Sequence, residues 1–269
     1  MSRILLFLAI LLAVLLVLAQ YLRRTGMFFP STDGNWDTHT LRVVPTEHFF
    51  TTSDGVRLHA WWFHAADANA PLILWFHGNA GNLTGRAEMA VELAKRGASV
   101  FVFDYRGFGK SAGEASESKL FFDSLAAFDF VRANTSAPVV LYGESVGGPY
   151  AAYVAKERKQ KNVRAVILEN TFPSLMDLGN ALYGLGWTAP RALRTTDWLN
   201  EAGAPVLVMH GTHDAVIPYR LGKKLFDGLR VRKEMFTSQT AGHCEIPAVE
   251  PSRYYETVIR FAITGGSAG

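Results

Sequence analysis

The chain has 269 residues, of which 49% are hydrophobic and 19% charged. This composition provides for one sizeable hydrophobic core, and α/β chains of this length commonly form a single domain. The net charge is +3 and no run of Lys or Arg exceeds two or three residues, so we expect no nucleic-acid partner. The single cysteine, Cys244, excludes an intramolecular disulfide.

An apolar run from Ile4 to Ala19 opens the chain and continues through Leu22 after one glutamine. Roughly 19 apolar residues at 1.5 Å each give a helix of about 28 Å, which can cross a bilayer. A cleaved signal peptide is the alternative, because Arg3 supplies a positive start and Ala19 a small residue at the end of the run.

The residues that follow the run favour an uncleaved anchor. Tyr21, Arg23 and Arg24 are typical of a helix end at a membrane interface. We therefore predict a single-pass membrane anchor or signal-anchor over residues 1–24 and a catalytic domain over residues 25–269. The domain is expected outside the cytoplasm, although positive charges on both sides of the run leave the orientation open.

Alternating strands and helices fill most of the predicted domain. Residues 47–52 and 56–63 flank Ser53-Asp54-Gly55, which is a hairpin signal. Further strands are predicted at 72–76, 99–103, 138–142 and 163–168, and helices at about 85–96, 117–133 and 147–159. This alternation predicts an α/β fold with a mostly parallel sheet and helices on both faces.

A glycine-rich segment, His77–Asn82, follows the predicted strand at 72–76. Such an exit can turn a backbone N–H inward, and acyl transfer requires two backbone donors for the developing oxyanion. We assign one donor to the N–H of Asn79. His77 is expected to have a structural role in fixing this loop.

The segment Gly107–Ala112 imitates a phosphate-binding loop. A P-loop needs glycine at the position of Asp104, and no helix begins directly at these glycines, so we expect no nucleotide. Histidines and carboxylates show no metal-ligand spacing, and we predict neither a metal nor another cofactor.

Gly143-Glu144-Ser145-Val146-Gly147 lies between a predicted strand and a predicted helix. A tight turn there raises the Ser145 hydroxyl out of the fold, and it is possible because the residues two places away on either side are glycine. Ser145 is the candidate nucleophile, and the N–H of Val146 at the helix start is the second oxyanion donor. Glu144 is expected at the surface or just behind the site.

Residues 172–203 interrupt the alternation and are rich in Leu, Met and Trp. We predict a helical cap over the site that receives an apolar acyl chain. An ordinary packed helix pair without ligand contact is the alternative.

Two further polar residues follow predicted strands. Asp214 follows the strand at 204–211, and His243 follows a short strand near 231–236. The order Ser145, Asp214, His243 is the order of a catalytic triad in α/β-hydrolases. Alternatives remain open: Asp214 could cap the helix that begins near residue 219, in which case Glu169 or Asp104 would replace it, and His210 or His213 could replace the histidine.

Several motifs together resemble the α/β-hydrolase-domain proteins of the Bem46 type, over about residues 28–261. They are His77–Asn82, Asp104–Ser111, Gly143–Gly148, Glu169–Phe172, His210–Asp214 and Gly242-His243. The resemblance implies an α/β-hydrolase fold and a membrane-anchored serine hydrolase that acts on acyl esters or thioesters, with Ser145, Asp214 and His243 as triad. Cys244-Glu245 departs from the pattern, since relatives often carry Asn-Asp after the histidine.

The expected function is therefore cleavage of small-molecule or acylated, lipid-like substrates through an acyl-enzyme intermediate. Two alternatives remain. One is a serine peptidase or amidase, because the same residues cleave amides. The other is a membrane-tethered binding or scaffold protein that keeps the fold without turnover.

Overall fold

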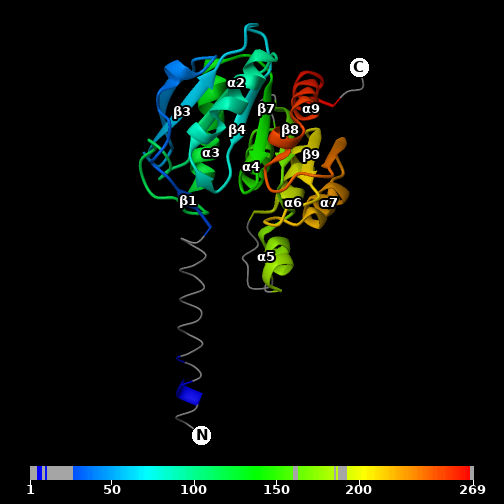
Figure 1. Ribbon diagram of the computed structural model, residues 1–269. Coiled ribbons are helices and arrows are strands. Elements are labelled where there is room, and N and C mark those ends of the chain that lie inside the picture. Colours follow the sequence, from blue (N-terminus) through cyan, green and yellow to red (C-terminus); the bar gives the residue numbers. More distant parts are fainter. Residues whose placement is uncertain are drawn as a thin grey trace.

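A computed structural model describes residues 5–7, 10, 27–159, 163–184, 186 and 193–266. Its centre is an eight-stranded sheet in the order β10-β9-β8-β7-β4-β6-β3-β2 (Figure 1). The strands of this sheet are β2 Thr46–Thr51, β3 Arg57–Phe63, β4 Leu72–Phe76, β6 Ser99–Asp104, β7 Val139–Glu144, β8 Val163–Glu169, β9 Val206–Gly211 and β10 Lys233–Ser238. Two short strands, β1 Phe29–Pro30 and β5 Ala80–Gly81, pair separately.

The sheet is mostly parallel, as predicted. Only β3 runs against its neighbours: it pairs antiparallel with β2 and with β6, while every other pair of strands is parallel. The predicted hairpin is β2–β3, and Gly55 in its turn has a φ of 85°, a backbone conformation in which glycine is favoured.

Helices cover both faces of the sheet. From residue 27 onward, the helices in the described part of the chain are η1 Thr38–Thr40, η2 Leu83–Arg86, α2 Ala87–Lys95, α3 Leu120–Asn134, α4 Gly147–Glu157, α5 Leu175–Tyr183, α6 Thr195–Ala202, α7 Tyr219–Gly228, α8 Ile246–Val249 and α9 Pro251–Thr264. Alternate residues of β4 show the two layers: Leu74 and Phe76 enter the core beneath α3, α4, α6 and α7, whereas Ile73 and Trp75 enter the core beneath α2 and α9. Both faces are buried, which explains the continuous apolar runs of these strands.

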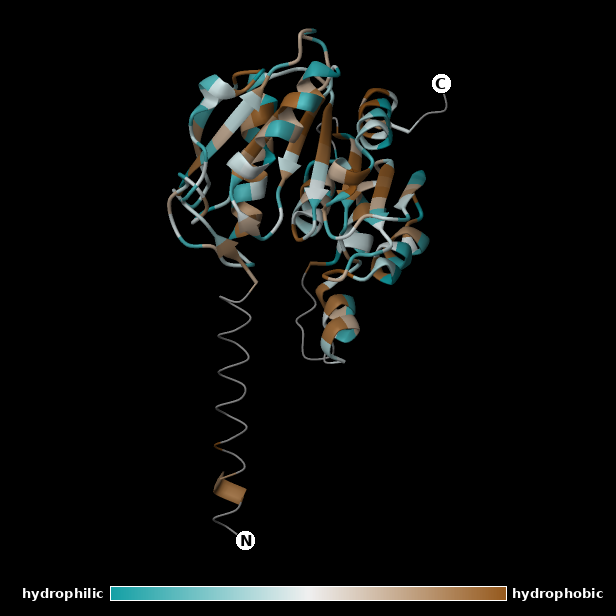
Figure 2. Cartoon of the chain, viewed as in Figure 1, coloured by the Kyte–Doolittle hydropathy of each residue, from teal (hydrophilic) through white to brown (hydrophobic). Residues whose placement is uncertain are grey.

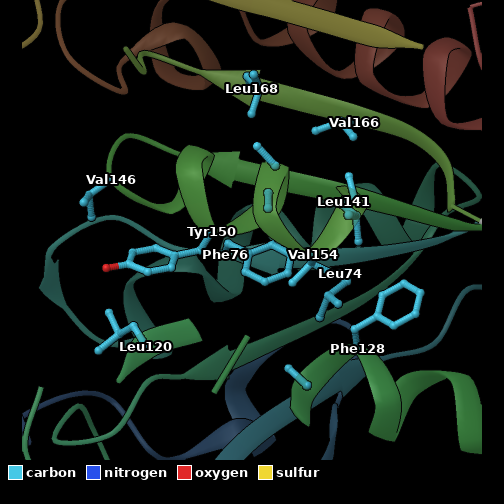
Figure 3. Close-up of a cluster of buried hydrophobic side chains, with 14 of the residues drawn as sticks. Leu74, Phe76, Leu120, Phe128, Leu141, Val146, Tyr150, Val154, Val166 and Leu168 are labelled. Atoms are coloured by element: carbon cyan, nitrogen blue, oxygen red, sulfur yellow. The ribbon is translucent and has the colours of Figure 1, made fainter. Parts of the chain in front are cut away.

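Figure 3 shows part of the first core between the sheet, α3 and α4. The labelled residues are Leu74, Phe76, Leu120, Phe128, Leu141, Val146, Tyr150, Val154, Val166 and Leu168. Val146 and Tyr150 belong to the turn and first helical residues that follow β7, so this core supports the segment that carries Ser145.

The insertion at 172–203 contains two different helices. The α6 helix buries Trp198 and Leu199 in the core, like an ordinary packed helix. The α5 helix has no buried residue and extends from the domain at the same end as β1 (Figure 1). Residues 185 and 187–192 of the predicted cap lie outside the described residues.

Most of the predicted anchor, residues 1–24, also lies outside the described residues. Within it only residues 5–7 and 10 are described, as helix with exposed side chains. In the described parts of the chain, no helix has both the length and the apolar character needed to span a membrane.

Candidate active site

Ser145 lies in a sharp turn between β7 and α4 that only small neighbours permit. Its φ is 53°, in the left-handed region that a residue with a side chain adopts at a cost. A Cβ on Gly147 would lie 2.0 Å from the carbonyl oxygen of Phe76, and a Cβ on Gly143 would lie 2.5 Å from the Cα of Gly148. Both glycines are therefore required by contact with backbone.

Three polar residues that are distant in sequence meet at this turn. His243 Nε2 lies 3.1 Å from Ser145 Oγ, and His243 Nδ1 lies 2.8 Å from Asp214 Oδ2. The three follow β7, β9 and β10, so each lies beyond the carboxyl end of a parallel strand, where α/β sheets bind ligands. The structure thus brings together the three side chains that the sequence singled out.

The environment of Asp214 keeps its carboxyl group ionised. Asn170 Nδ2 donates to Asp214 Oδ2 over 2.6 Å, and His210 Nε2 lies 3.3 Å from the same oxygen. Burial raises the pKa of Asp214, but the hydrogen bonds from His210 and His243 outweigh it and hold the pKa well below its usual range. An ionised carboxylate only accepts, so His243 Nδ1 carries the proton and Nε2 is left to accept from Ser145.

Asp214 also stabilises the turn before α7. Its Oδ1 accepts the backbone N–H groups of Val216 and Ile217, each over 2.8 Å. The helix itself begins after Pro218 without a side-chain cap. Asp214 therefore does not cap α7, the alternative role considered from the sequence, but stabilises the turn that precedes it and keeps Oδ2 available to His243.

The two alternative acids have other partners. Glu169 accepts a hydrogen bond from the Tyr142 hydroxyl, and burial raises the pKa of Glu169 to about 8. Asp104 Oδ1 accepts the N–H of Leu83 over 2.7 Å and lies 3.4 Å from His77 Nε2. No contact described for either carboxylate reaches His243.

The two candidate oxyanion donors lie beside the serine. Asn79, Ser145 and Val146 line one cavity. Across the described ranges, no hydrogen bond uses the backbone N–H of Asn79 or of Val146. Both N–H groups are therefore available to a developing negative charge.

An ion pair between Glu144 and Arg86, an arginine that the sequence analysis did not single out, supports the loop that carries Asn79. Glu144 is buried, and Arg86 Nη2 donates to its Oε1 over 2.5 Å while Trp75 Nε1 donates to its Oε2 over 3.2 Å. Burial raises the pKa of Glu144, but Arg86 outweighs it and the pKa is lowered. Arg86 Nη1 also donates to the backbone oxygen of Ala80, so this ion pair supports the loop. Glu144 thus lies behind the site, one of the two places expected for it.

His77 and Cys244 flank the site without joining the three residues. The ring of His77 contacts the Gly78 carbonyl, with Nδ1 at 2.7 Å, which fixes the loop as the sequence suggested. Cys244 has a φ of 57°, in the left-handed region that a residue with a side chain adopts at a cost. Glu245 Oε2 accepts the N–H of Gly242 over 2.9 Å, which stabilises the turn around His243. Within the described ranges, no group of three or more His, Cys, Asp or Glu residues could hold a metal ion.

A cavity of about 300 Å³ opens at Ser145. Its walls come from the loop that carries Asn79, the turn at Ser145, α5 and the segment before α7. The lining residues are Met27, Asn79, Ser145, Val146, Phe172, Leu175, Leu178, Gly179, Leu182, Tyr183, Val216 and Ile217. Most of them are hydrophobic, and α5 supplies five of the twelve.

Known proteins share this sequence pattern and this fold. Residues 71–197 match the family model described as alpha/beta hydrolase fold, and residues 182–265 match one described as TAP-like protein. The chain is 32% identical over 205 residues to the uncharacterized protein YfhR of Escherichia coli strain K12, covering 73% of this chain and 72% of the relative. It is 30% identical over 188 residues to the lysophosphatidylserine lipase ABHD12 of Rattus norvegicus, covering 62% of this chain and 47% of the lipase. An esterase of Pyrococcus furiosus has the same fold, with a TM-score of 0.72 at 21% identity over 87% of this chain and 97% of the esterase.

Proposed function

This chain belongs to the α/β-hydrolase superfamily and is a hydrolase, and we propose that it cleaves acyl esters or thioesters through Ser145, His243 and Asp214. The observation that carries the proposal is the continuous contact from the Ser145 hydroxyl through the His243 ring to the Asp214 carboxylate. This is the arrangement in which a histidine activates a serine and an ionised carboxylate holds the histidine.

In the proposed reaction, His243 Nε2 removes the proton from Ser145 Oγ as the oxygen attacks the acyl carbonyl. The N–H groups of Asn79 and Val146 bind the oxyanion, and each such donor typically contributes about 10²- to 10³-fold to kcat. The imidazolium, stabilised by Asp214, then protonates the leaving alcohol or thiol. Water attacks the resulting acyl-serine ester with His243 again as base, which releases the acid and restores the serine.

The cavity favours an apolar acyl group. The side chains of Leu175, Leu178 and Leu182 from α5 and of Phe172 face the space beside Ser145. Small-molecule sites are usually largely apolar with a few polar groups that fix orientation. We therefore propose that α5 acts as the cap over the acyl group and that the substrate is lipid-like or otherwise acylated. The lipase and the esterase among the similar proteins support an ester hydrolase.

A series of p-nitrophenyl esters of increasing chain length tests this function. We expect kcat/KM to rise from acetate to a medium chain, and Ser145→Ala to lower hydrolysis by at least about 10³-fold. A preference for acetate would contradict the apolar acyl site, and faster cleavage of the matching anilides would favour an amidase. A tethered binding protein without turnover would hydrolyse none of these compounds.

We further propose that the domain is held at a membrane with the cavity mouth facing the bilayer. The rim of the cavity exposes Leu182, Tyr183 and Val216, with 39%, 74% and 54% of their surface accessible. Met27, which also lines the cavity, follows the end of the predicted anchor by three residues, a span of about 10 Å at most. In Figure 2, α5 and β1 lie at the same end of the domain.

Fluorescence tests this placement. A polarity-sensitive dye is attached to Tyr183→Cys or, as control, to Ile263→Cys, both in full-length chains that also carry Cys244→Ala. With phospholipid vesicles we expect a blue shift and quenching by spin-labelled lipid at position 183 but not at 263. Equal responses at the two positions would contradict the proposed contact between the cavity mouth and the bilayer.

The domain is proposed to lie outside the cytoplasm. In that case, protease added to intact cells cuts the domain before the cells are lysed.

A further inference from the structure

A short segment at the start of the domain binds the loop that carries Asn79. We call residues 27–33 the N-terminal strap. Its β1 strand pairs in parallel with β5, so that Phe29 lies opposite Ala80. The Phe29 N–H donates to the Asn79 carbonyl over 2.7 Å, and the Ser31 N–H donates to the Gly81 carbonyl over 3.1 Å. The strap therefore extends the oxyanion loop into a two-stranded ribbon.

The strap holds Asn79 from two sides. Besides the bond from Phe29, the side-chain Nδ2 of Asn79 donates to the Met27 carbonyl over 3.0 Å. Phe28, between these two contacts, is buried and packs edge-on against Phe108, with 6.5 Å between ring centroids. The carbonyl and the side-chain amide of Asn79 are thus fixed by a segment that is itself fixed in the core. The backbone N–H is left for the cavity that Asn79 lines.

The other end of the loop is attached in the same way. Asn82 is 2% exposed, and its Nδ2 donates to the carbonyls of Ser31 and Asp33 over 2.9 and 2.8 Å. Its Oδ1 accepts the N–H of Thr84 over 3.0 Å, so Asn82 caps the start of η2. Gly109, after β6, donates its N–H to the same Ser31 carbonyl over 3.0 Å. The strap therefore joins the loop at residues 79 and 82 to the rest of the domain.

We propose that the N-terminal strap is a positioning element of the oxyanion hole. This inference rests on the proposed function, and it adds a segment that supplies no reacting atom. A donor acts on the transition state only when its N–H points at the oxyanion, and small displacements at a reacting centre can cost up to 10²-fold. Loosening the strap at Phe29, which does not line the cavity, therefore lowers kcat while the apolar side chains of α5 keep KM. Cleavage after Ala19, the alternative noted for the N-terminal run, leaves the strap in the chain.

Two variants at Phe29 separate the effect of the backbone hydrogen bond to Asn79 from the effect of the Phe29 side chain. Phe29→Pro removes the N–H that binds Asn79, whereas Phe29→Ala keeps it. The Phe29 side chain is 58% exposed, so its loss alone has little effect. With a short soluble ester we expect Phe29→Pro to lower kcat by about 10- to 100-fold with KM within about twofold. A trifluoromethyl ketone, whose adduct carries an oxyanion, should lose affinity by a similar factor.

The outcomes separate the strap from the reaction itself. A folded Phe29→Pro variant with the kcat of Phe29→Ala, or with a change in KM alone, would overturn the positioning role although the wild type hydrolyses esters. No hydrolysis by the wild type would instead overturn the proposed function, and the strap's role with it. If Phe29→Pro does not fold, Asn79→Ala keeps the backbone N–H but loses the bond to Met27. We expect it to lower kcat by about 3- to 10-fold, and an unchanged kcat would refute the role.

Discussion

Replacing Asp214 by asparagine exchanges one carboxylate oxygen for an amide group that only donates hydrogen bonds. The Oδ1 position accepts two backbone N–H groups, from Val216 and Ile217, which cannot reverse their polarity. The amide oxygen must therefore take that position, and the NH₂ group must take the position of Oδ2, facing His243 Nδ1 at about the present 2.8 Å. Asn170 can turn its own amide to present an oxygen.

This orientation forces the wrong tautomer on His243. Its Nδ1 becomes the acceptor and Nε2 carries the proton, so Nε2 cannot take a proton from the Ser145 hydroxyl 3.1 Å away. A wrong tautomer in a catalytic triad lowers kcat by about 10⁴-fold, which is about 5.4 kcal/mol at 1.36 kcal/mol per factor of ten. Because the two backbone hydrogen bonds to position 214 are kept, we expect the variant to fold.

The assay compares kcat/KM for a short p-nitrophenyl ester and the melting temperature of three proteins. Asp214→Asn is compared with the wild type and with Asp129→Asn, whose carboxylate pairs with Arg158. We expect the large loss in Asp214→Asn alone. If a folded Asp214→Asn variant retained more than a tenth of the wild-type activity, another group would have to orient the base, and the tautomer reasoning would be refuted.

Three further predictions concern stability and specificity. Burial raises the pKa of Glu169 to about 8 in the folded protein, above its unfolded value, so this group's stabilisation is complete at acidic pH and is lost as pH rises toward 8. As pH rises from acidic values to 8, the melting temperature should fall less in Glu169→Gln than in the wild type. An equal fall in the two proteins would contradict the raised pKa of Glu169. Gly147→Ala places a Cβ 2.0 Å from the Phe76 carbonyl, so urea unfolding should show a loss of about 3 kcal/mol or more, whereas Gly85→Ala, with open space, should be nearly neutral. Leu178→Trp fills the acyl cavity and should shift the preferred p-nitrophenyl ester to a shorter chain; an unchanged optimum would exclude Leu178 from the acyl site.

Local sequence patterns were sufficient for the central sheet and for the positions of the three polar residues. The run from Leu72 to Phe76 forms β4 with the predicted ends, because a strand buried on both faces requires an uninterrupted apolar run. Ser145 and Asp214 each follow such a strand, whereas His243 follows the edge strand β10, in which only Phe236 and Ser238 are buried. Parallel strands bring all three carboxyl ends to one edge. Their meeting therefore follows from topology.

Residues whose partners lie far along the chain could not be predicted in the same way. Arg86 and Glu144 are 58 positions apart, and no local sequence pattern indicates that they form an ion pair. Asn170 binds Asp214 over 44 positions, and only its polarity beside a strand end marked it. These contacts depend on how the loops pack against one another, and the hydrophobic periodicity of a segment does not determine that packing.

The strap and the insertion show a second limit. The segment before Val44 gave no strand signal in the sequence, because its strand has only two residues, one of them Pro30. Within the insertion, the apolar side chains of α5 line the cavity whereas those of α6 enter the core, and both helices are comparably amphipathic in sequence. The hydrophobicity of a helix therefore does not show whether its apolar face lines a ligand cavity or packs into the core.

The proposed function requires the Ser145 hydroxyl to be nucleophilic because His243 accepts its proton and Asp214 orients the His243 ring. Labelling with a fluorophosphonate, followed by mass spectrometry of the modified peptide, tests it most directly. We predict that folded wild-type protein is labelled on Ser145, that heat-denatured protein is not, and that Ser145→Ala abolishes labelling. Labelling that persists in Ser145→Ala, or a folded wild-type protein that takes up no label, would contradict the account.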